Sequence, residues 1–452
     1  MGHKPNILFV MTDQQSANMM SCSGTSWVNT PNLDKLANNG IRFSRAYCGN
    51  PVCVPSRFSI FTGKLPETIG LRSNSHKKLQ SWSKNILKQG MGHVFKQGGY
   101  QCVYAGKQHF PGYSAKELGF DILTTDEREK LADESCKFIK EKHDKPWLLV
   151  TSFINPHDVC FKGIVDWLDN TKGRENDEST IEYITMKKFD KIPEYMDEDY
   201  FYNKVCPKAP LNMLPQQDEP EILQDFLDQR EFKRYLANNY SIKDWRMHRY
   251  IYKKLTELMD VQVGKVLNAL EQSGQINNTL VVFTSDHGDM DGSHRFEHKT
   301  VLYEEAIKIP LIISHKGKLT EGITSDILCS NALDLYPTLL EYVGIKVPKD
   351  LNGINMINAV KSPEQSRKYV PIESEIGRCI VTKNYRYVKY DFGKNNEQLY
   401  DYVKDPLETK NHINNLDNKN VVVNLKSIFN MQWSKTQQKG NPSPLLKGKL
   451  RI

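Results

Sequence analysis

The stretch Asn6-Ile7-Leu8-Phe9-Val10-Met11-Thr12-Asp13 is a short apolar run that ends in two polar residues. A continuous run of this length, rich in branched and aromatic side chains, is typical of a strand buried on both faces of a parallel sheet. Similar runs follow at residues 100–105, 147–153 and 279–284, each closed by polar residues that include His, Asp or Lys. Because the carboxyl ends of parallel strands share one edge of a sheet, we expect these polar side chains to meet there.

Length and composition exclude several classes of protein. The chain has 452 residues, 39% of them apolar, which is enough to bury a large core without disulfides. No stretch has the roughly 20 consecutive apolar residues of a membrane-spanning helix, so we predict no membrane span. The net charge of +7 is modest and no long Lys/Arg tract occurs, so nucleic acid is not an expected partner. Nine scattered cysteines without a CxxC pair indicate neither a disulfide framework nor a zinc ribbon.

Helical patterns lie between the predicted strands. The clearest covers residues 250–271, where apolar side chains recur close to every 3.6 residues. A shorter helix is predicted from Pro31 to Asn39, with Thr30 as its N-cap and Pro31 at its first position. Strands that alternate with helices predict an α/β fold, with a large, mostly parallel sheet flanked by helices.

Two regions depart from this pattern. Residues 158–245 are polar and aromatic, and we interpret them as an insertion over the edge of the sheet, helical within 220–238. From about residue 348 the pattern changes to short strand-like pieces at 369–373, 379–382, 385–390 and 398–402, followed by a helical stretch at 421–438. We therefore predict a catalytic domain at 1–347 and a smaller C-terminal subdomain at 348–452, an antiparallel sheet with one helix.

The densest motif is Cys53-Val54-Pro55-Ser56-Arg57, followed by Thr62-Gly63. Taken alone, Cys53 would be interpreted as a buried structural thiol. With its neighbours, it resembles the motif of the type I sulfatase family, within the alkaline phosphatase-like superfamily. In that family a maturation enzyme oxidises the cysteine to formylglycine, and its hydrated aldehyde is the nucleophile. The resemblance therefore implies a formylglycine at Cys53 that Arg57 orients, and an alkaline phosphatase-like fold.

Asp13-Gln14 and Asp286-His287 each follow a predicted strand and match the metal positions of that family. The resemblance implies one divalent ion, Ca²⁺ in most members with Mg²⁺ or Mn²⁺ as alternatives, bound by these residues and by the modified Cys53. The commonest pairs in the family are Asp-Asp and Asp-Asn. Gln14 removes one negative charge, and His287 offers nitrogen to a cation that prefers oxygen. For Gln14, the alternative to ligation is a hydrogen bond to a neighbouring group.

Other motifs extend the resemblance along the chain: Gly106-Lys107-Gln108-His109, Asn155-Pro156-His157, and Lys299 ahead of Tyr303-Glu304-Glu305. The resemblance implies that Lys107 contacts formylglycine and sulfate, and that His109 takes a proton when sulfate leaves. It also implies that Lys299 binds sulfate oxygens. For His157 it implies a general acid that protonates the leaving alcohol, a role that suits an imidazole near pH 7. Taken alone, lysines and histidines in such turns are mostly exposed.

Sugar contacts are less specific in the sequence. Candidates are His76 and its neighbour Asn74, together with aromatic residues of the insertion, namely Tyr200, Phe201 and Tyr202. For all of them an ordinary surface position is an equal alternative.

Together these features predict hydrolysis of a sulfate ester, exo-acting on a sulfated saccharide such as a glycosaminoglycan fragment. One alternative is a phosphonate monoester or phosphodiester hydrolase that uses the same nucleophile. An alternative of another class is an inactive sulfoglycan-binding protein in which Cys53 stays a thiol. The start Met1-Gly2-His3-Lys4-Pro5 lacks the apolar segment of a secretory leader. We expect an exported protein whose leader precedes this numbering, with a cytoplasmic protein as the alternative.

Overall fold

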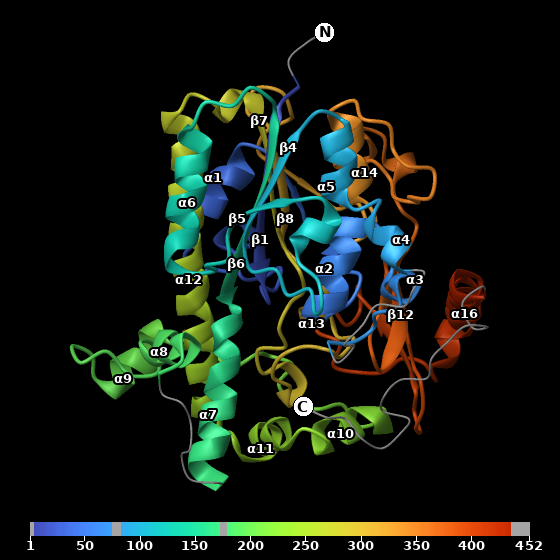
Figure 1. The fold of residues 1–452 in the computed structure, drawn as a ribbon. Helices are drawn as coiled ribbons and strands as arrows, with labels where there is room; N and C mark the ends of the chain where they lie inside the picture. Colours follow the sequence, from blue (N-terminus) through green and yellow to red (C-terminus); the bar gives the residue numbers. More distant parts are fainter. Residues whose placement is uncertain (1–3, 75–82, 172–178, 435–452) are drawn as a thin grey trace.

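The computed structural model, which describes residues 4–74, 83–171 and 179–434, contains an 8-stranded sheet in the order β5-β4-β6-β1-β7-β8-β2-β9 (Figure 1). Neighbouring strands are parallel except for β8, which runs antiparallel to β7 and β2. The four strands predicted from apolar runs are confirmed as β1, β4, β6 and β7. The strands are β1 Asn6–Asp13, β2 Ile41–Phe43, β4 Gln101–Gly106, β5 Asp121–Thr124, β6 Trp147–Pro156, β7 Thr279–Ser285, β8 Leu311–Ser314 and β9 Ile323–Ser325.

Helices cover both faces of this sheet (Figure 1). Along β1, Ile7 and Phe9 pack into one apolar cluster, and Leu8 and Val10 pack into another. This alternation follows from the pleat of a strand, which directs successive side chains to opposite faces. One face carries α1 Pro31–Asn38, α6 Glu129–Lys140 and α12 Ile242–Gln272, and the other carries α2 Cys53–Thr62, α5 Met91–Gln97 and α14 Leu335–Tyr342. The predicted α/β class is confirmed.

The start of α1 differs from its prediction in one respect. Thr30 occupies the N-cap position, but its side chain does not cap the helix. It accepts a hydrogen bond from the backbone N–H of Ser21 instead. The cap comes from Asp260 of α12, whose carboxylate accepts from the backbone N–H groups of Asn32 at 3.1 Å and Leu33 at 2.9 Å. A carboxylate from a distant helix satisfies donors that a local residue was expected to satisfy.

The insertion consists of short helices at the end of the sheet where β1 and β7 terminate (Figure 1). They are α7 Cys160–Thr171, α8 Ile181–Lys187, α9 Glu198–Tyr200, a π-helical turn at Phe201–Val205, α10 Glu221–Asp228 and α11 Glu231–Asn239. The helical stretch predicted within 220–238 is confirmed as two helices, α10 and α11, which are separated by a short turn that ends at Arg230. Its guanidinium lies 2.9 Å from Glu375 of the C-terminal subdomain, a long-range contact that the local pattern does not contain.

The C-terminal subdomain is a 4-stranded antiparallel sheet in the order β11-β12-β13-β14, with one helix packed on it. Leu425, Phe429 and Trp433 of the helix pack against Ile380 and Leu399 of the sheet. Its elements are β11 Val370–Glu373, β12 Gly377–Val381, β13 Tyr385–Tyr390, β14 Glu397–Asp401 and α16 Lys419–Trp433. These confirm the predicted strands and helix, although residues 435–438 of the predicted helix lie outside the described residues.

Shorter elements connect these layers: α3 Pro66–Ile69, α4 Ser83–Leu87, α13 Glu304–Ile307, α15 Met356–Lys361 and the paired strands β3 Ala46–Tyr47 and β10 Cys329–Ser330. All nine cysteines are free thiols. Within the described ranges, none of the helices combines the length and the apolar character needed to cross a membrane.

A buried arginine joins the C-terminal sheet to the main sheet. Arg386 of β13 is fully buried, and its guanidinium lies 3.3 Å from Glu304 at the start of α13 and donates to Glu408. Burial, with the nearby Glu304 and Glu305 carboxylates, raises the pKa of Glu408 to about 8 despite the opposing effect of Arg386. Arg386 therefore holds the buried Glu408 and the half-buried Glu304 together across the junction.

Replacing this arginine tests the junction. Arg386→Met should lower the free energy of unfolding by about 1–3 kcal/mol near pH 7, because the buried Glu408 carboxyl loses its hydrogen-bond donor while Glu304 keeps Lys308 as a partner. The double variant Arg386→Met/Glu408→Leu should recover part of that loss, since the buried polar group left without its donor is then removed. Urea denaturation followed by circular dichroism measures both effects. Equal midpoints for the wild type and Arg386→Met would show that the ion pair does not stabilise the fold.

Candidate active site

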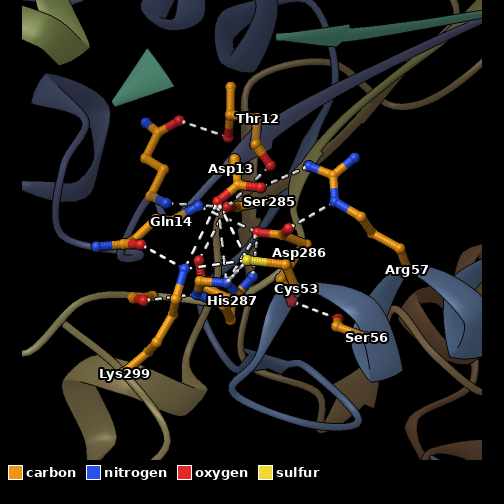
Figure 2. Close-up of polar contacts among 12 residues, drawn as sticks. Thr12, Asp13, Gln14, Cys53, Ser56, Arg57, Ser285, Asp286, His287 and Lys299 are labelled. Carbon is orange, nitrogen blue, oxygen red and sulfur yellow. Dashed lines mark hydrogen bonds and ion pairs between the residues drawn. The ribbon is translucent and has the colours of Figure 1, made fainter. Parts of the chain in front are cut away.

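Segments far apart in the sequence bring polar side chains together at the carboxyl ends of β1 and β7 (Figure 2). Cys53, the first residue of α2, lies at the centre. Its Sγ is 3.0 Å from Lys299 Nζ, 3.2 Å from His287 Nε2 and 3.6 Å from Asp13 Oδ1. All of these side chains are at least nine-tenths buried. The meeting of strand ends that the sequence predicted is therefore present.

Arg57 fixes the two carboxylates of this cluster. Its Nη2 is 2.9 Å from Asp13 Oδ2 and its Nε is 2.9 Å from Asp286 Oδ2, with all three side chains fully buried. Its Nη1 donates to the Lys107 carbonyl and to Ser152 Oγ. Each carboxylate thus directs one oxygen to the guanidinium and leaves the other facing Cys53 and His287. Burial alone would raise the pKa of Asp13, but Lys107, His157, Arg57 and Lys299 hold it well below its usual value.

Lys107 reaches the cluster because β4 ends in a glycine. Gly106 has φ +92°, and a Cβ at this position would lie 2.2 Å from the Ser152 carbonyl oxygen. This close approach lets the backbone N–H of Lys107 donate to the same carbonyl, and its Nζ lies 2.7 Å from Asp13 Oδ2. Two residues further on, His109 is exposed and has no hydrogen bond or ion pair with any described residue.

His287 is held as a candidate metal ligand. Its Nδ1–H donates to the Gly288 carbonyl at 2.8 Å, so Nε2 is the ring nitrogen that faces the cluster. Burial and Lys299 act to lower the pKa of this imidazole, but Asp286 and Cys53 raise it, so a metal ion would bind Nε2 in exchange for a proton. Potential ligand atoms of Asp13, Cys53, Asp286 and His287 all lie within 4.8 Å of one another. Two carboxylates and a neutral imidazole suit a divalent cation, so the donor set fits the metal that the sequence motifs imply.

Gln14 follows β1 in a left-handed backbone conformation, with φ +67°. Its backbone N–H donates to Asp286 Oδ1, while its side-chain Oε1 accepts from Lys299 Nζ at 2.6 Å. Its Nε2 donates to Asp289 Oδ2 at 2.5 Å. The structure therefore places Gln14 in the hydrogen-bonding arrangement, and its ligation of a metal stays a prediction.

Asp289 is a site residue that sequence reasoning missed. It is fully buried and orients the Gln14 amide through the hydrogen bond described above. The available signal was its position in Asp286-His287-Gly288-Asp289, three residues beyond a predicted ligand. Burial raises the pKa of Asp289, whereas His248 and the Gln14 hydrogen bond lower it.

His157 follows β6 and has a lowered pKa of about 4. Burial is the largest cause, followed by the charges of Lys107 and Lys299, while Asp13 and a hydrogen bond with Cys53 act in the opposite direction. Its Nδ1 is buried without a hydrogen-bond partner among the described residues. The imidazole is therefore neutral near pH 7 in this state.

The Cys53 thiol has a strongly acidic character. Burial and Asp13 act to raise its pKa, but Lys299, His287 and Lys107 bring it well below the ordinary value. A sulfur anion is thus favoured at this position, and Sγ stands where an oxygen of a converted residue would stand. The surrounding cations are arranged around an anionic centre.

The predicted sugar contacts have mixed outcomes. His76 lies outside the described residues. Asn74 Oδ1 accepts from the backbone N–H of Val54 at 2.9 Å, so Asn74 lies beside Cys53 at the start of α2. The expectation for Phe201 is wrong, because Phe201 is fully buried against Tyr250 in a separate apolar cluster.

Comparisons with known proteins agree with this geometry. The family profile described as Sulfatase matches residues 5–345, and one described as N-sulphoglucosamine sulphohydrolase, C-terminal, matches residues 292–435. The chain is 31% identical to the uncharacterized sulfatase YidJ of Escherichia coli (strain K12), over 91% of this chain and 84% of that protein. It is 26% identical to an N-acetylglucosamine-6-O-sulfatase of Bacteroides thetaiotaomicron, over 90% and 82%. A solved 2-O GAG sulfatase, BT1596, superposes with a TM-score of 0.79 at 25% identity, covering 96% of this chain and 93% of that one.

The donor set predicts ion-dependent stability. Titration with Ca²⁺ or Mg²⁺ should raise the melting temperature of the wild type, because an ion that binds only the folded state stabilises it. Asp286→Asn should abolish this rise by removing one anionic ligand. Asp260→Asn is the matched control, since it weakens the cap of α1 outside the cluster and should lower the melting temperature but keep the rise. An undiminished rise in Asp286→Asn would contradict the assignment.

Proposed function

The chain belongs to the sulfatase family and is a sulfuric ester hydrolase, and from this premise we propose that it removes sulfate from saccharides, acting on the terminal unit of glycosaminoglycan-type fragments. The observation that carries the proposal is the position of Cys53 between Lys299, His287 and Asp13. Support for a saccharide comes from relatives that share nearly the whole chain and are named for sulfated sugars.

In this proposal Cys53 is converted to formylglycine before the enzyme works. A separate maturation enzyme would supply an external acceptor that takes two electrons from the Cβ–S unit, and sulfur would then be exchanged for a water oxygen. Once hydrated, the aldehyde supplies one hydroxyl that attacks sulfur and a second whose loss of a proton releases sulfate. A serine or a thiol lacks this second hydroxyl.

The protein side chains supply the charge that the reaction needs. A sulfate ester is an anion, and an anionic nucleophile approaches it only where positive charge is already fixed. Lys299 and Lys107 bring two buried ammonium groups to the cluster, within 3.0 Å of Cys53 Sγ and 2.7 Å of Asp13 Oδ2 respectively. We assign both to the sulfate oxygens, and Arg57 to holding Asp13 and Asp286.

His157 is assigned as the general acid for the leaving alcohol. Its pKa of about 4 means that the free enzyme holds it neutral near pH 7. A bound sulfate anion opposes the effect of Lys107 and Lys299 and favours the protonated imidazole. For His109 we propose that it takes the proton of the second hydroxyl when sulfate leaves, a proposal supported by its place two residues after Lys107.

We propose Ca²⁺ as the resident ion, with Asp13, Asp286, His287 and the converted Cys53 as its ligands. A bound divalent cation polarises the ester oxygens and lowers the pKa of a hydroxyl that it contacts. The carboxylates already face the site with the oxygens that Arg57 leaves free, so the protein holds them in place for an ion.

The proposal is tested with protein co-produced with a maturation enzyme. Mass spectrometry of the peptide that contains Cys53 establishes conversion, because sulfur is exchanged for oxygen. The converted enzyme is then assayed on N-acetylglucosamine 6-sulfate, other sulfated saccharides, an aryl sulfate and an aryl phosphonate. Saccharide desulfation supports the proposal. Higher kcat/KM on the phosphonate, or no sulfate release by fully converted protein, would overturn it.

A substitution at Cys53 tests the proposed nucleophile. Cys53→Ser should bind the sulfated saccharide but show no multiple turnover, because serine offers a single hydroxyl and cannot release sulfate through a carbonyl. Sulfate release measured by ion chromatography, alongside calorimetric binding, separates these effects. Sustained turnover by Cys53→Ser would rule out the formylglycine route.

A substitution at His157 tests its proposed role as the general acid. His157→Ala should lower kcat on saccharide sulfates by roughly 10²–10⁴-fold, the usual contribution of a general acid. The loss on 4-nitrophenyl sulfate should be much smaller, because nitrophenolate leaves without a proton. Steady-state assays with both substrates provide the comparison. Equal losses on the two substrates would assign His157 to sulfate binding instead.

A further inference from the structure

Lys233 is a buried lysine outside the cluster described above. It lies on α11 of the insertion and is 2% exposed. Its Nζ has one hydrogen bond, a long one of 3.5 Å to the backbone carbonyl of Glu297. Among residues 4–74, 83–171 and 179–434, no carboxylate oxygen lies within ion-pair distance of this ammonium. Lys233 is therefore buried without a counter-charge.

The other buried lysines among the described residues have anionic or strongly polar partners. Lys107 pairs with Asp13, and Lys299 contacts the Cys53 thiol; the half-buried Lys162 likewise pairs with Asp166 and Asp190. Buried charges in proteins are normally paired in this way, because an unpaired one is strongly destabilising. Apart from its long hydrogen bond to the Glu297 carbonyl, Lys233 lies over the faces of two aromatic rings, Phe226 at 4.9 Å and Phe232 at 5.9 Å.

The position of Lys233 connects it to the reaction site. The carbonyl that it contacts belongs to Glu297, two residues before Lys299. The adjacent Phe232 ring lies 5.5 Å from the ring of His298, which immediately precedes Lys299. In Figure 1, α10 and α11 lie at the end of the molecule where the loop before α13 emerges. Lys233 thus touches the segment that carries the proposed sulfate-binding lysine.

Two buried acidic groups, Glu297 and Asp289, belong to the segment that Lys233 contacts. Neither forms an ion pair with Lys233: the buried Glu297 carboxylate lies against His298 Nδ1 without a hydrogen-bond partner among the described residues, and Asp289 accepts from the Gln14 amide. Burial, the nearby Arg230 and Lys299 lower the pKa of Lys233 well below its ordinary value, against the smaller opposing effects of Cys160 and Asp289. An incoming anion would supply the negative charge that no described residue places within ion-pair distance of Lys233.

We propose that Lys233 anchors a second anion-binding subsite, which takes a carboxylate or a second sulfate group of the saccharide whose ester sulfate lies at Lys299. This inference rests on the proposed function and narrows its substrate class to saccharides with at least two acidic groups. A substrate with one sulfate and no other charge leaves the ammonium unpaired, whereas a second anionic group pairs with it. The insertion therefore selects the substrate, while the strand ends carry the chemistry.

The test compares converted enzyme on substrates that differ in their second charge. N-acetylglucosamine 6-sulfate carries one acidic group, glucosamine 2-N,6-O-disulfate carries a second sulfate, and a 2-sulfated Δ4,5-hexuronate carries a carboxylate. The wild type should show a kcat/KM about tenfold or more higher on one of the doubly charged sugars than on the singly charged one, in line with a charge-assisted hydrogen bond. The two doubly charged arms distinguish sulfate from carboxylate.

Variants of Lys233 test whether this residue causes the preference for doubly charged sugars. Lys233→Met should reduce the ratio of kcat/KM between doubly and singly charged sugars to near one, and Lys233→Arg should retain most of it. Arg234→Met, which removes the neighbouring exposed charge on the same helix, is the matched control and should keep the wild-type ratio. If Lys233→Met does not fold, the ratio of kcat/KM in the wild type and in Lys233→Arg still shows whether the second subsite exists.

Two outcomes count against the inference in different ways. If the wild type has equal kcat/KM on the singly and doubly charged sugars, the second subsite is overturned and the proposed function stands. The same conclusion follows if Lys233→Met keeps the wild-type ratio of kcat/KM. Failure of converted wild-type enzyme on every sulfated substrate would instead overturn the proposed function. A thermal melt of each variant shows whether a change in ratio is accompanied by loss of structure.

Discussion

The site depends on one buried guanidinium placed between two buried carboxylates. Arg57 binds Asp13 at the end of β1 and Asp286 beyond the end of β7, so it joins helix α2 to two adjacent strands of the sheet. Cys53 and Arg57 are four residues apart on α2, which places them on the same face of the helix, one turn apart. The carboxylates thus fix Arg57, Arg57 fixes the first turn of α2, and that turn fixes Cys53.

Electrostatics explain why such a buried polar cluster is tolerated. Asp13 keeps a lowered pKa because Lys107, His157, Arg57 and Lys299 outweigh the cost of burial. The same lysines depress the pKa of the Cys53 thiol and of the His157 imidazole. Positive charge is therefore fixed before any substrate arrives, and an anionic sulfate replaces the thiolate as the group that these cations face. Charge fixed in advance in this way lowers a barrier without reorganisation during the reaction.

Local patterns in the sequence predict the framework but not its long-range partners. The run from Asn6 to Asp13 identifies β1 because burial on both faces leaves a continuous apolar stretch, and the motif at Cys53 predicts the nucleophile that we propose. The cap of α1 by Asp260 and the break in the insertion at Arg230 arise from contacts between residues more than a hundred positions apart. The role of Asp289 depends on which way the Gln14 amide points, a property of the folded cluster that no spacing reveals.

We assign catalysis to the site at the strand ends and substrate selectivity to the helical insertion. The groups that we propose to act on sulfate lie at strand ends, on α2 and, for Lys299, on the loop before α13, where a substitution disturbs several buried charges at once. Lys233 lies on α11, a short helix that contacts the site segment through the Glu297 carbonyl and the His298 ring. An exchange at this position changes one cation and two ring contacts while the carboxylates stay paired. The insertion is also coupled to the site directly, because Cys160 of α7 hydrogen-bonds the Gln14 amide, whose oxygen accepts from Lys299.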